Sequence, residues 1–389
     1  MKLTSGGAMM HLSFAGLSQF CLSVGLAAGG LFFAPTVCRY NFRMIPPSPA
    51  RPHRIARILA ALAILPLTGW GALALWFQLP HPAALAAGAV WCLLGLGAVF
   101  TLLSGSARRH ARRAGAAFAL AALLLLAWWQ SLAPSHERVW ADDVARMLES
   151  RIDGERVTLH NVRNFDWRTE TSYVPRWETR EYDLAQLRSA DLILSYWMGP
   201  HIAHTLVSFG FDDGRKLVFS LEIRKERQES FSALGGFFRE FEQVMIAADE
   251  RDIVRTRSNV RREDVYLYRV RATPAQLRDL FRAYLQRAAQ LRRQPEFYNT
   301  LTSNCTTIVF ELARRIAPGL PLDYRLLASG HVDEYAYDQD VLAPGVPFAE
   351  LRRLGYIDVR ARQADGADSA AFSRAIRTGV PGVPAAEQR

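Results

Sequence analysis

The chain has 389 residues, enough for two or three structural units, and its formal net charge is +10. The excess charge is confined to the start, because no Asp or Glu precedes Glu137 and that stretch contains Lys2 and nine arginines. Of the 47 basic and 37 acidic residues, 37 of each lie after it, which argues against a nucleic-acid partner. We therefore interpret the excess positive charge as a signal of membrane topology.

Three apolar stretches between residues 51 and 134 predict a transmembrane α-helical block. Each stretch is roughly 20 residues long, the length that a helix needs to cross a ~30 Å hydrocarbon layer. No Asp, Glu or Lys lies within them, so we expect a plain anchor and not an ion or proton path. The predicted spans are Ile58–Phe77, Ala83–Leu103 and Ala114–Leu132.

The arginines predict how this block is oriented. Arginine clusters at 51–57 and 108–113 flank the spans, and arginines in short loops concentrate on the cytoplasmic side. The uncharged joint near Pro80 and everything after Pro134 then lie on the opposite side, with Trp128 and Trp129 in the outer interfacial belt. We predict a multi-pass protein of the bacterial inner (cytoplasmic) membrane with its C-terminal domain in the periplasm.

Residues 1–50 are compatible with three interpretations. The apolar stretch Leu12–Val37 is interrupted by Ser, Gln and four glycines, and it predicts either a fourth span or a signal-like segment. The third interpretation is that Met44 is the true initiator. Each of the three leaves Arg39–Arg57 on the cytoplasmic side, so the predicted topology of the main block does not depend on the choice.

Residues 138–355 combine strand-like and helix-like patterns and predict an α+β domain with an antiparallel sheet. Thr273, Pro274 and Gln276 predict the capped start of a helix. The stretch 184–196 is mixed in pattern. The predicted strands are Val157–Phe165, His204–Phe211, Lys216–Arg224, Gln243–Ala248 and Val265–Val270.

The strand pair around Asp212-Asp213-Gly214 predicts a hairpin with a definite register. A three-residue loop with Gly214 in the left-handed conformation places Val207 opposite Phe219, which matches apolar with apolar. The same register places Glu222 opposite His204 on the other face. Cross-strand partners lie about 5 Å apart, so we expect the carboxylate to orient the imidazole.

Cys305 is the one thiol after the membrane block, and it lies at the predicted start of a helix that Ser303 or Asn304 can cap. The positive end of the helix dipole favours a thiolate there, and free N–H groups in the first turn can bind an oxyanion. A lone cysteine on an apolar helix face is more often a core residue. An unpaired thiol in an oxidising compartment is nevertheless a liability, which favours a functional role.

These residues support a Cys–His site with Cys305 as nucleophile, His204 as base and Glu222 as orienter. A lone histidine on a strand is more often structural, and His201 and His160 are rival bases. No cluster of His, Cys or Asp has metal-ligand spacing, and no glycine-rich phosphate loop is present, so we predict no metal and no cofactor.

Four segments in this order resemble the Lnb-type N-terminal periplasmic domain family over roughly 140–335. The resemblance implies a circularly permuted papain-like, NlpC-type fold, in which the His-bearing strand precedes the Cys-bearing helix, as in lecithin:retinol acyltransferase-type enzymes with their Asn-Cys motif. The segments are Ala203–Phe211, Phe219–Arg224, Asp249–Asp252 and Tyr298–Thr307.

The resemblance implies a catalytic set of Cys305, His204, Asn304 and either Glu222 or Ser220 as orienter. It also implies a thiol acyltransferase or hydrolase acting on lipid or lipoprotein acyl groups, although family members that act on lipoproteins lack three leading spans. A cell-wall peptidase or amidase on the same fold, and a non-catalytic membrane-tethered module, are the competing functions. Further substrate-binding candidates are Ser220, Arg224, Arg251 and Tyr298. Residues 360–389, rich in Ala, Gly, Arg and Asp, predict a disordered tail.

Overall fold

The computed structural model describes residues 21–27, 30–36, 51–104 and 106–388, which pack as two units, 1–60 and 61–389. In the first unit, β1 (Cys21–Ala27) and β2 (Gly30–Thr36) form an antiparallel pair. The described part of the possible fourth span, Leu12–Val37, is therefore a strand pair and not a helix. The rest of that stretch and Met44 lie outside the described residues, so a signal-like segment and initiation at Met44 both stay predictions.

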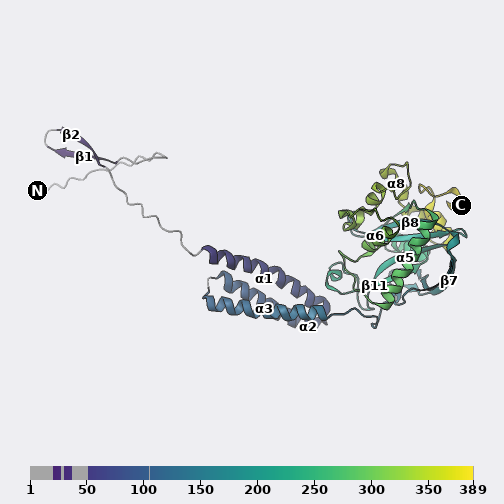
Figure 1. The fold of residues 1–389 in the computed structure, drawn as a ribbon, viewed down its shortest axis with the longest axis horizontal. Helices are drawn as coiled ribbons and strands as arrows, with labels where there is room; N and C mark the ends of the chain where they lie inside the picture. The colour runs from purple at the N-terminus through teal and green to yellow at the C-terminus, as the bar shows by residue number, and fades with distance from the viewer. Residues whose placement is uncertain (1–20, 28–29, 37–50, 105, 389) are drawn as a thin grey trace. The chain divides into compact units, whose positions relative to one another are not determined.

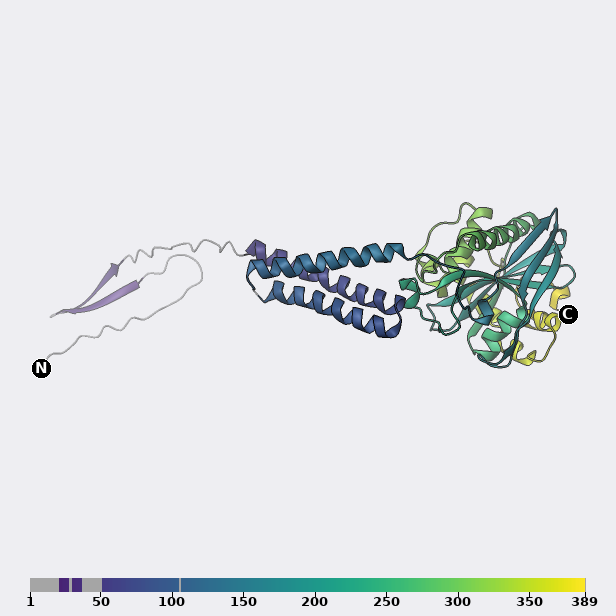
Figure 2. The same cartoon turned by 90° about the horizontal axis from the view of Figure 1, so that it is seen from below.

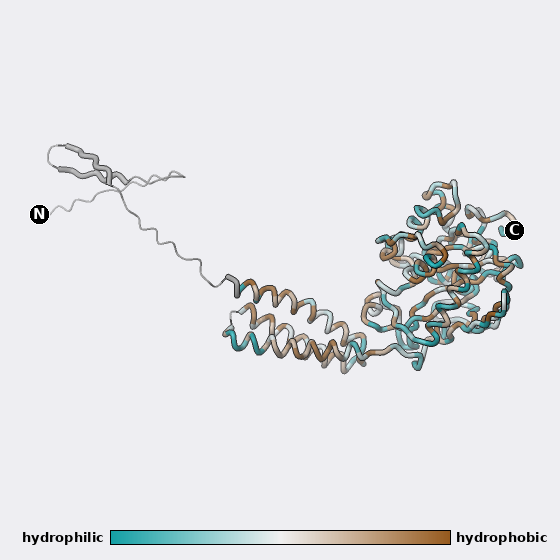
Figure 3. The backbone as a smooth tube through the Cα atoms, viewed as in Figure 1, coloured by the Kyte–Doolittle hydropathy of each residue, from teal (hydrophilic) through white to brown (hydrophobic). Residues whose placement is uncertain are grey.

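Among the described residues, three helices are long and apolar enough to cross a membrane. They are α1 (Arg51–Gln78), α2 (His81–Leu103) and α3 (Arg108–Ser131), and they lie side by side (Figures 1 and 2). They extend past the predicted spans into the flanking arginines because basic side chains are compatible with a helix. Figure 3 shows their apolar character and the hydrophilic start of α3.

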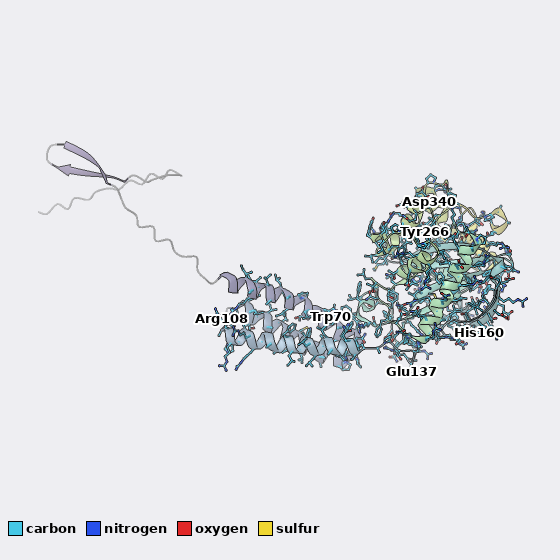
Figure 4. All side chains as sticks on the ribbon, viewed as in Figure 1. Trp70, Arg108, Glu137, His160, Tyr266 and Asp340 are labelled. Carbon is cyan, nitrogen blue, oxygen red and sulfur yellow. The ribbon has the colours of Figure 1, made fainter. Side chains whose placement is uncertain are left out.

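The helices contact one another through small and aromatic side chains. Trp91 Nε1 donates to the Thr68 carbonyl at 2.8 Å, and Gly95 lies so close to Thr68 that no Cβ would fit. Large apolar side chains such as Leu93 point outward instead, which is the pattern of helices whose surroundings are lipid. Figure 4 shows Arg108 at one end of this block and Trp70 toward the other.

The C-terminal domain is built on a mixed sheet, which confirms the predicted α+β class. In the described part of the chain its strand order is β12-β8-β9-β10-β11-β4-β3, with β7 also paired to β4. The predicted antiparallel sheet is wrong at one pair, because β11 and β4 are parallel. A separate small pair is formed by β5 (Asp166–Trp167) and β6 (Tyr173–Val174). The strands of the large sheet are β3 (Glu149–Asp153), β4 (Arg156–Arg163), β7 (Trp177–Asp183), β8 (Leu187–Tyr196), β9 (Ala203–Phe211), β10 (Lys216–Arg224), β11 (Glu242–Ala248) and β12 (Asp264–Arg269).

Helices cover both faces of this sheet because its strands carry apolar side chains on both sides. On one face, Phe209 and Phe219 pack against α5 (Pro274–Arg293) and α6 (Cys305–Ile316). On the other, Leu206 and Val218 pack against α4 (Glu250–Arg255), α9 (Asp358–Gln363) and α10 (Ser369–Arg377). Figure 1 shows α5 lying over the strands. The remaining helices are α7 (Val332–Asp338), α8 (Phe348–Gly355) and α11 (Ala385–Gln388).

The predicted hairpin register is confirmed. Val207 lies opposite Phe219, and Gly214 has a φ of 83° in the three-residue loop. The predicted start of α5 is also confirmed, with Thr273 and Gln276 forming a capping box. The relationship to a permuted papain-like fold stays a prediction.

The predicted disordered tail is wrong. Phe372 and Ile376 of α10 are fully buried against the sheet, and Arg377 forms ion pairs with Asp191 and Glu250 at 2.7 and 2.5 Å. The Ala- and Arg-rich composition hides a short helix whose apolar side chains recur every four residues. The domain therefore continues past the predicted boundary at 355, to residue 388.

Candidate functional site

Cys305 is the first residue of α6, and Asn304 is its N-cap. The Asn304 Oδ1 accepts hydrogen bonds from the N–H groups of Thr306 and Thr307, both at 2.9 Å, while Thr307 Oγ1 accepts the Asn304 N–H. The Asn304 Nδ2 donates to the Thr300 carbonyl at 2.7 Å. The side chain of Asn304 thus fixes the first turn of α6 through both its oxygen and its nitrogen. Of the first three N–H groups of α6, only that of Cys305 has no hydrogen bond to this cap.

A contact between α6 and β9 brings the thiol to the histidine. The hydroxyls of Thr205 and Thr306, which follow His204 and Cys305 in the chain, are 2.8 Å apart and buried. This bond holds the first turn of α6 against the first residues of β9. Cys305 and His204 are consequently neighbours, although about 100 residues separate them in the sequence, and each is close enough to shift the pKa of the other.

A relay of polar groups holds the His204 ring. The His204 Nε2 lies 2.7 Å from Ser220 Oγ, and Ser220 donates to Glu222 Oε1 at 2.7 Å. The same carboxylate oxygen is 3.3 Å from Nε2 and accepts a 2.7 Å hydrogen bond from Arg257 Nη2. Because Nε2 is occupied by these groups, Nδ1 is the ring nitrogen available to Cys305.

The charges of this cluster favour a thiolate–imidazolium pair. Burial lowers the pKa of His204, but the neighbouring charges of Cys305 and Glu222 outweigh burial and raise it to about 9. Burial raises the pKa of the Cys305 thiol, but His204 and the Thr205 backbone bring it below its ordinary value. Burial also acts to raise the pKa of Glu222, and the charges of His204 and Arg257 hold it well below its usual range. These shifts are those of an activated nucleophile.

A pocket of about 480 Å³ adjoins this cluster, and His204, Glu222, Arg257 and Tyr298 line it. Cys305 is only 6% exposed and does not line the pocket. The pocket therefore exposes His204 and Tyr298, with the thiol behind them. Burial and the nearby charges of Cys305 and Glu222 raise the pKa of Tyr298, so its hydroxyl stays protonated and can donate.

Three of the four predicted substrate-binding residues do not line the pocket: Ser220 is buried beside His204, and two arginines lie elsewhere. Arg224 is buried over the Trp140 ring and donates to the carbonyls of Val144 and Ala145. Arg251 donates to the Ala367 carbonyl and to Asp166. Both side chains are held by structural contacts, so neither is available to a substrate. The sequence pattern could not show this, because it does not reveal which guanidinium groups already have hydrogen-bond partners.

The rival histidines also lie elsewhere. The His201 Nδ1 is 2.8 Å from His331 Nε2, and His160 is exposed and bonded to Thr179. No group of three or more His, Cys, Asp or Glu side chains that could hold a metal ion occurs among the described residues. The arrangement brings together Cys305, His204, Ser220, Glu222 and Tyr298, and it adds Arg257.

Sequence reasoning missed Arg257. It lies in the π-helical turn Thr256–Val260 that follows α4, and no motif or spacing connects it to Glu222. The only signal in the sequence was electrostatic: a carboxylate that remains ionised when it is buried requires a cation beside it.

Fold and site together define an α+β domain with a helix-borne thiol next to an oriented histidine, preceded by helices apolar enough to cross a membrane. Residues 173–330 match the model of a family described as the Lnb N-terminal periplasmic domain. The matched segment runs from β6 past α6 and contains all six residues of the cluster. No curated protein and no solved structure matches the chain.

Proposed function

We propose that the protein is a membrane-anchored, periplasmic thiol acyltransferase or hydrolase. The observation that carries the proposal is the cluster in which Cys305 contacts His204 while Ser220, Glu222 and Arg257 hold the ring. A structural cysteine and histidine need neither a lowered thiol pKa nor a buried carboxylate relay behind the imidazole.

In the proposed mechanism the Cys305 thiolate attacks the carbonyl carbon of an ester or amide. The N–H of Cys305 and the hydroxyl of Tyr298 donate to the oxygen that becomes negative. When the carbonyl re-forms, the bond to the alcohol or amine breaks, and the imidazolium of His204 protonates that leaving group. The acyl group is then a thioester on Cys305, and neutral His204 takes a proton from an incoming amine or water that releases it.

Two features support an acyl group of a membrane lipid or lipoprotein as the substrate. The family that matches is a periplasmic domain family, and α1–α3 are apolar enough to cross the inner membrane. With the arginine-flanked ends of the helices in the cytoplasm, the C-terminal domain lies in the periplasm within a few residues of the bilayer. A cell-wall peptide is the competing substrate.

The proposal is tested by trapping the acyl-enzyme. Full-length protein in detergent or vesicles is incubated with an alkyne-tagged acyl phospholipid, and adducts sensitive to hydroxylamine are measured on the intact chain by mass spectrometry. We expect one thioester on the wild type, none on Cys305→Ser, and at least a roughly hundredfold slower formation on His204→Ala.

Three results bear against the proposal. An adduct of equal size on Cys305→Ser places the reaction elsewhere. Release of muropeptide fragments without any lipid adduct identifies a cell-wall amidase on the same site. If Cys305→Ala and His204→Ala both retain full function in cells, the domain is a non-catalytic module.

A further inference from the structure

The loop between β10 and β11 presents apolar side chains that the described residues only half cover. Phe231, Leu234 and Phe237 are 44–48% exposed, and Leu301 is 44% exposed. Because each is about half in water, part of the free energy that full burial contributes is not gained in the isolated protein. A group of them on one surface is the usual mark of an interaction site.

This loop is attached to the ends of α1 and α3 that lie opposite the arginines. Phe238 stacks on Phe77 with ring centroids 5.5 Å apart, and Gln78 Nε2 donates to the carbonyls of Phe238 and Arg239, both at 2.8 Å. Arg239 in turn donates to the Trp129 carbonyl at 2.6 Å. The loop is therefore fixed at the level where these helices end.

The backbone of the loop is held in an unfavourable conformation at that contact. Arg239 has a φ of 56°, in the left-handed region that non-glycine residues rarely adopt. Arg239 takes this conformation as the C-cap of the short 3-10 turn Gly235–Phe238, where its N–H donates to the Gly235 carbonyl. The end of this turn is the part of the loop that contacts Gln78 and Trp129.

The same loop also contacts the segment before Cys305. Thr300 Oγ1 donates to the Ala233 carbonyl at 2.8 Å, and Gly236 approaches Thr300 so closely that an added Cβ would lie 2.3 Å from its hydroxyl. At the other end of the loop, Phe231 packs edge-on against Trp197 with ring centroids 4.7 Å apart. Both of these rings line the pocket beside His204.

We propose that the loop 231–239, together with Leu301, docks into the outer leaflet of the membrane that α1–α3 cross. We choose the leaflet as the binding partner for two reasons. The loop contacts the ends of helices whose outward surface is lipid-facing, and aromatic side chains favour the membrane–water interface. The pocket mouth at Trp197 and Phe231 then opens at the level of the lipid head groups. Docking depends on α1–α3 crossing the membrane and is independent of the chemistry of Cys305.

The test places a photo-crosslinking phenylalanine analogue at single positions of the full-length protein. The protein is reconstituted in vesicles of phosphatidylethanolamine and phosphatidylglycerol, irradiated, and analysed for lipid adducts by mass spectrometry. Positions 234 and 237 are compared with Leu322 and Val359, which are 80% and 53% exposed and lie outside the loop. Leu93 on α2 is the positive control.

We expect lipid adducts at 93, 234 and 237 with at least tenfold the yield at 322 and 359, and the same pattern in a Cys305→Ser background. Adducts at 93 but only background yield at 234 and 237 overturn the proposal. Crosslinks between two copies of the chain at 234 and 237, in place of lipid, also overturn it.

A second measurement separates docking from catalysis. Leu234→Glu combined with Phe237→Glu is expected to lower turnover of a bilayer-embedded acyl lipid roughly tenfold or more, since the burial of the two half-exposed side chains is together worth about one factor of ten or more. Turnover of a short water-soluble thioester is expected to stay unchanged. Equal loss with both substrates, or no loss with either, contradicts the proposed docking.

Discussion

The ionisation of Cys305 and His204 depends on the charged side chains around them. Arg257 keeps Glu222 ionised, Glu222 and the thiolate keep His204 protonated, and His204 keeps the thiol deprotonated. Cys305 and Arg257 are buried, and the side chains of His204 and Glu222 are only 17% and 18% exposed, so removing one charge leaves its neighbours poorly compensated. Cys305, His204 and Glu222 are therefore expected to titrate as a unit.

The substitution Glu222→Gln should shift the pH profile of acylation. Imidazolium is retained below the His204 pKa of about 9 and is lost above it, so the wild-type rate should decline as pH rises past about 9. Removing the carboxylate deletes a charge that raises this pKa and leaves Arg257, which lowers it. We expect the alkaline limb of the rate of thioester formation to move to lower pH.

The control for that experiment is Glu229→Gln, which removes a second carboxylate of the same pocket that does not contribute to the raised pKa of His204. Its alkaline limb should coincide with the wild-type limb. An unshifted limb in Glu222→Gln would show that the carboxylate does not set the ionisation of the imidazole.

Asn304→Ala should lower both stability and activity, because Asn304 orders the turn that bears the thiol. Loss of an N-cap costs about 1 kcal/mol of the free energy of unfolding. Thr273→Ala, which removes the cap of α5, is the matched control with a similar cost. Denaturant unfolding and acylation rates are measured for both; only Asn304→Ala should lower the rate, and equal rates would contradict a positioning role.

At the scale of elements, α10 completes the domain by covering an acidic site on the sheet. Asp191 on β8 and Glu250 on α4 are both fully buried, and Arg377 lies between them. The helix thereby supplies the arginine that pairs with buried Glu250, and it gives Asp191 a second partner beside Arg269. Its packing requires Asp191 and Glu250, which are distant in the sequence.

Arg377→Ala is expected to destabilise the domain by roughly 3–5 kcal/mol, because it leaves buried Glu250 without its arginine, while Asp191 keeps Arg269. Arg374→Ala changes an exposed arginine of the same helix and should cost less than about 0.5 kcal/mol. Thermal and denaturant unfolding measure both. Equal midpoints for the two variants would mean that the ion pairs contribute nothing net to stability.

At the scale of the whole molecule, the arginine clusters predict which ends of α1–α3 face the cytoplasm. Alkaline phosphatase, which is active only outside the cytoplasm, reports this when fused after chosen residues. Fusions after Pro80 and Pro134 should be active and a fusion after Arg113 inactive, since arginines are retained inside. The reverse pattern would place the domain in the cytoplasm.

Local chemistry was sufficient to predict several elements of the fold from the sequence alone. The apolar length of the three helices, the hairpin register around Gly214 and the capped starts of α5 and α6 each depend on residues close together in the chain. Glu222 was placed opposite His204 by strand periodicity alone, and the 3.3 Å contact between them agrees with that placement.

Tertiary structure alone decided the remainder. Arg257 joins the site, and Arg224 and Arg251 are excluded from it, because hydrogen-bond partners of a guanidinium come from distant segments. β8 is buried on both faces, so its sequence shows no alternation of polar and apolar residues. The sequence of α10 is short and polar, and its place in the fold depends on the ion pairs of Arg377 with Asp191 and Glu250. Thus the sequence determined the membrane block and the candidate dyad, while long-range charge pairing decided which groups surround the thiol and where the domain ends.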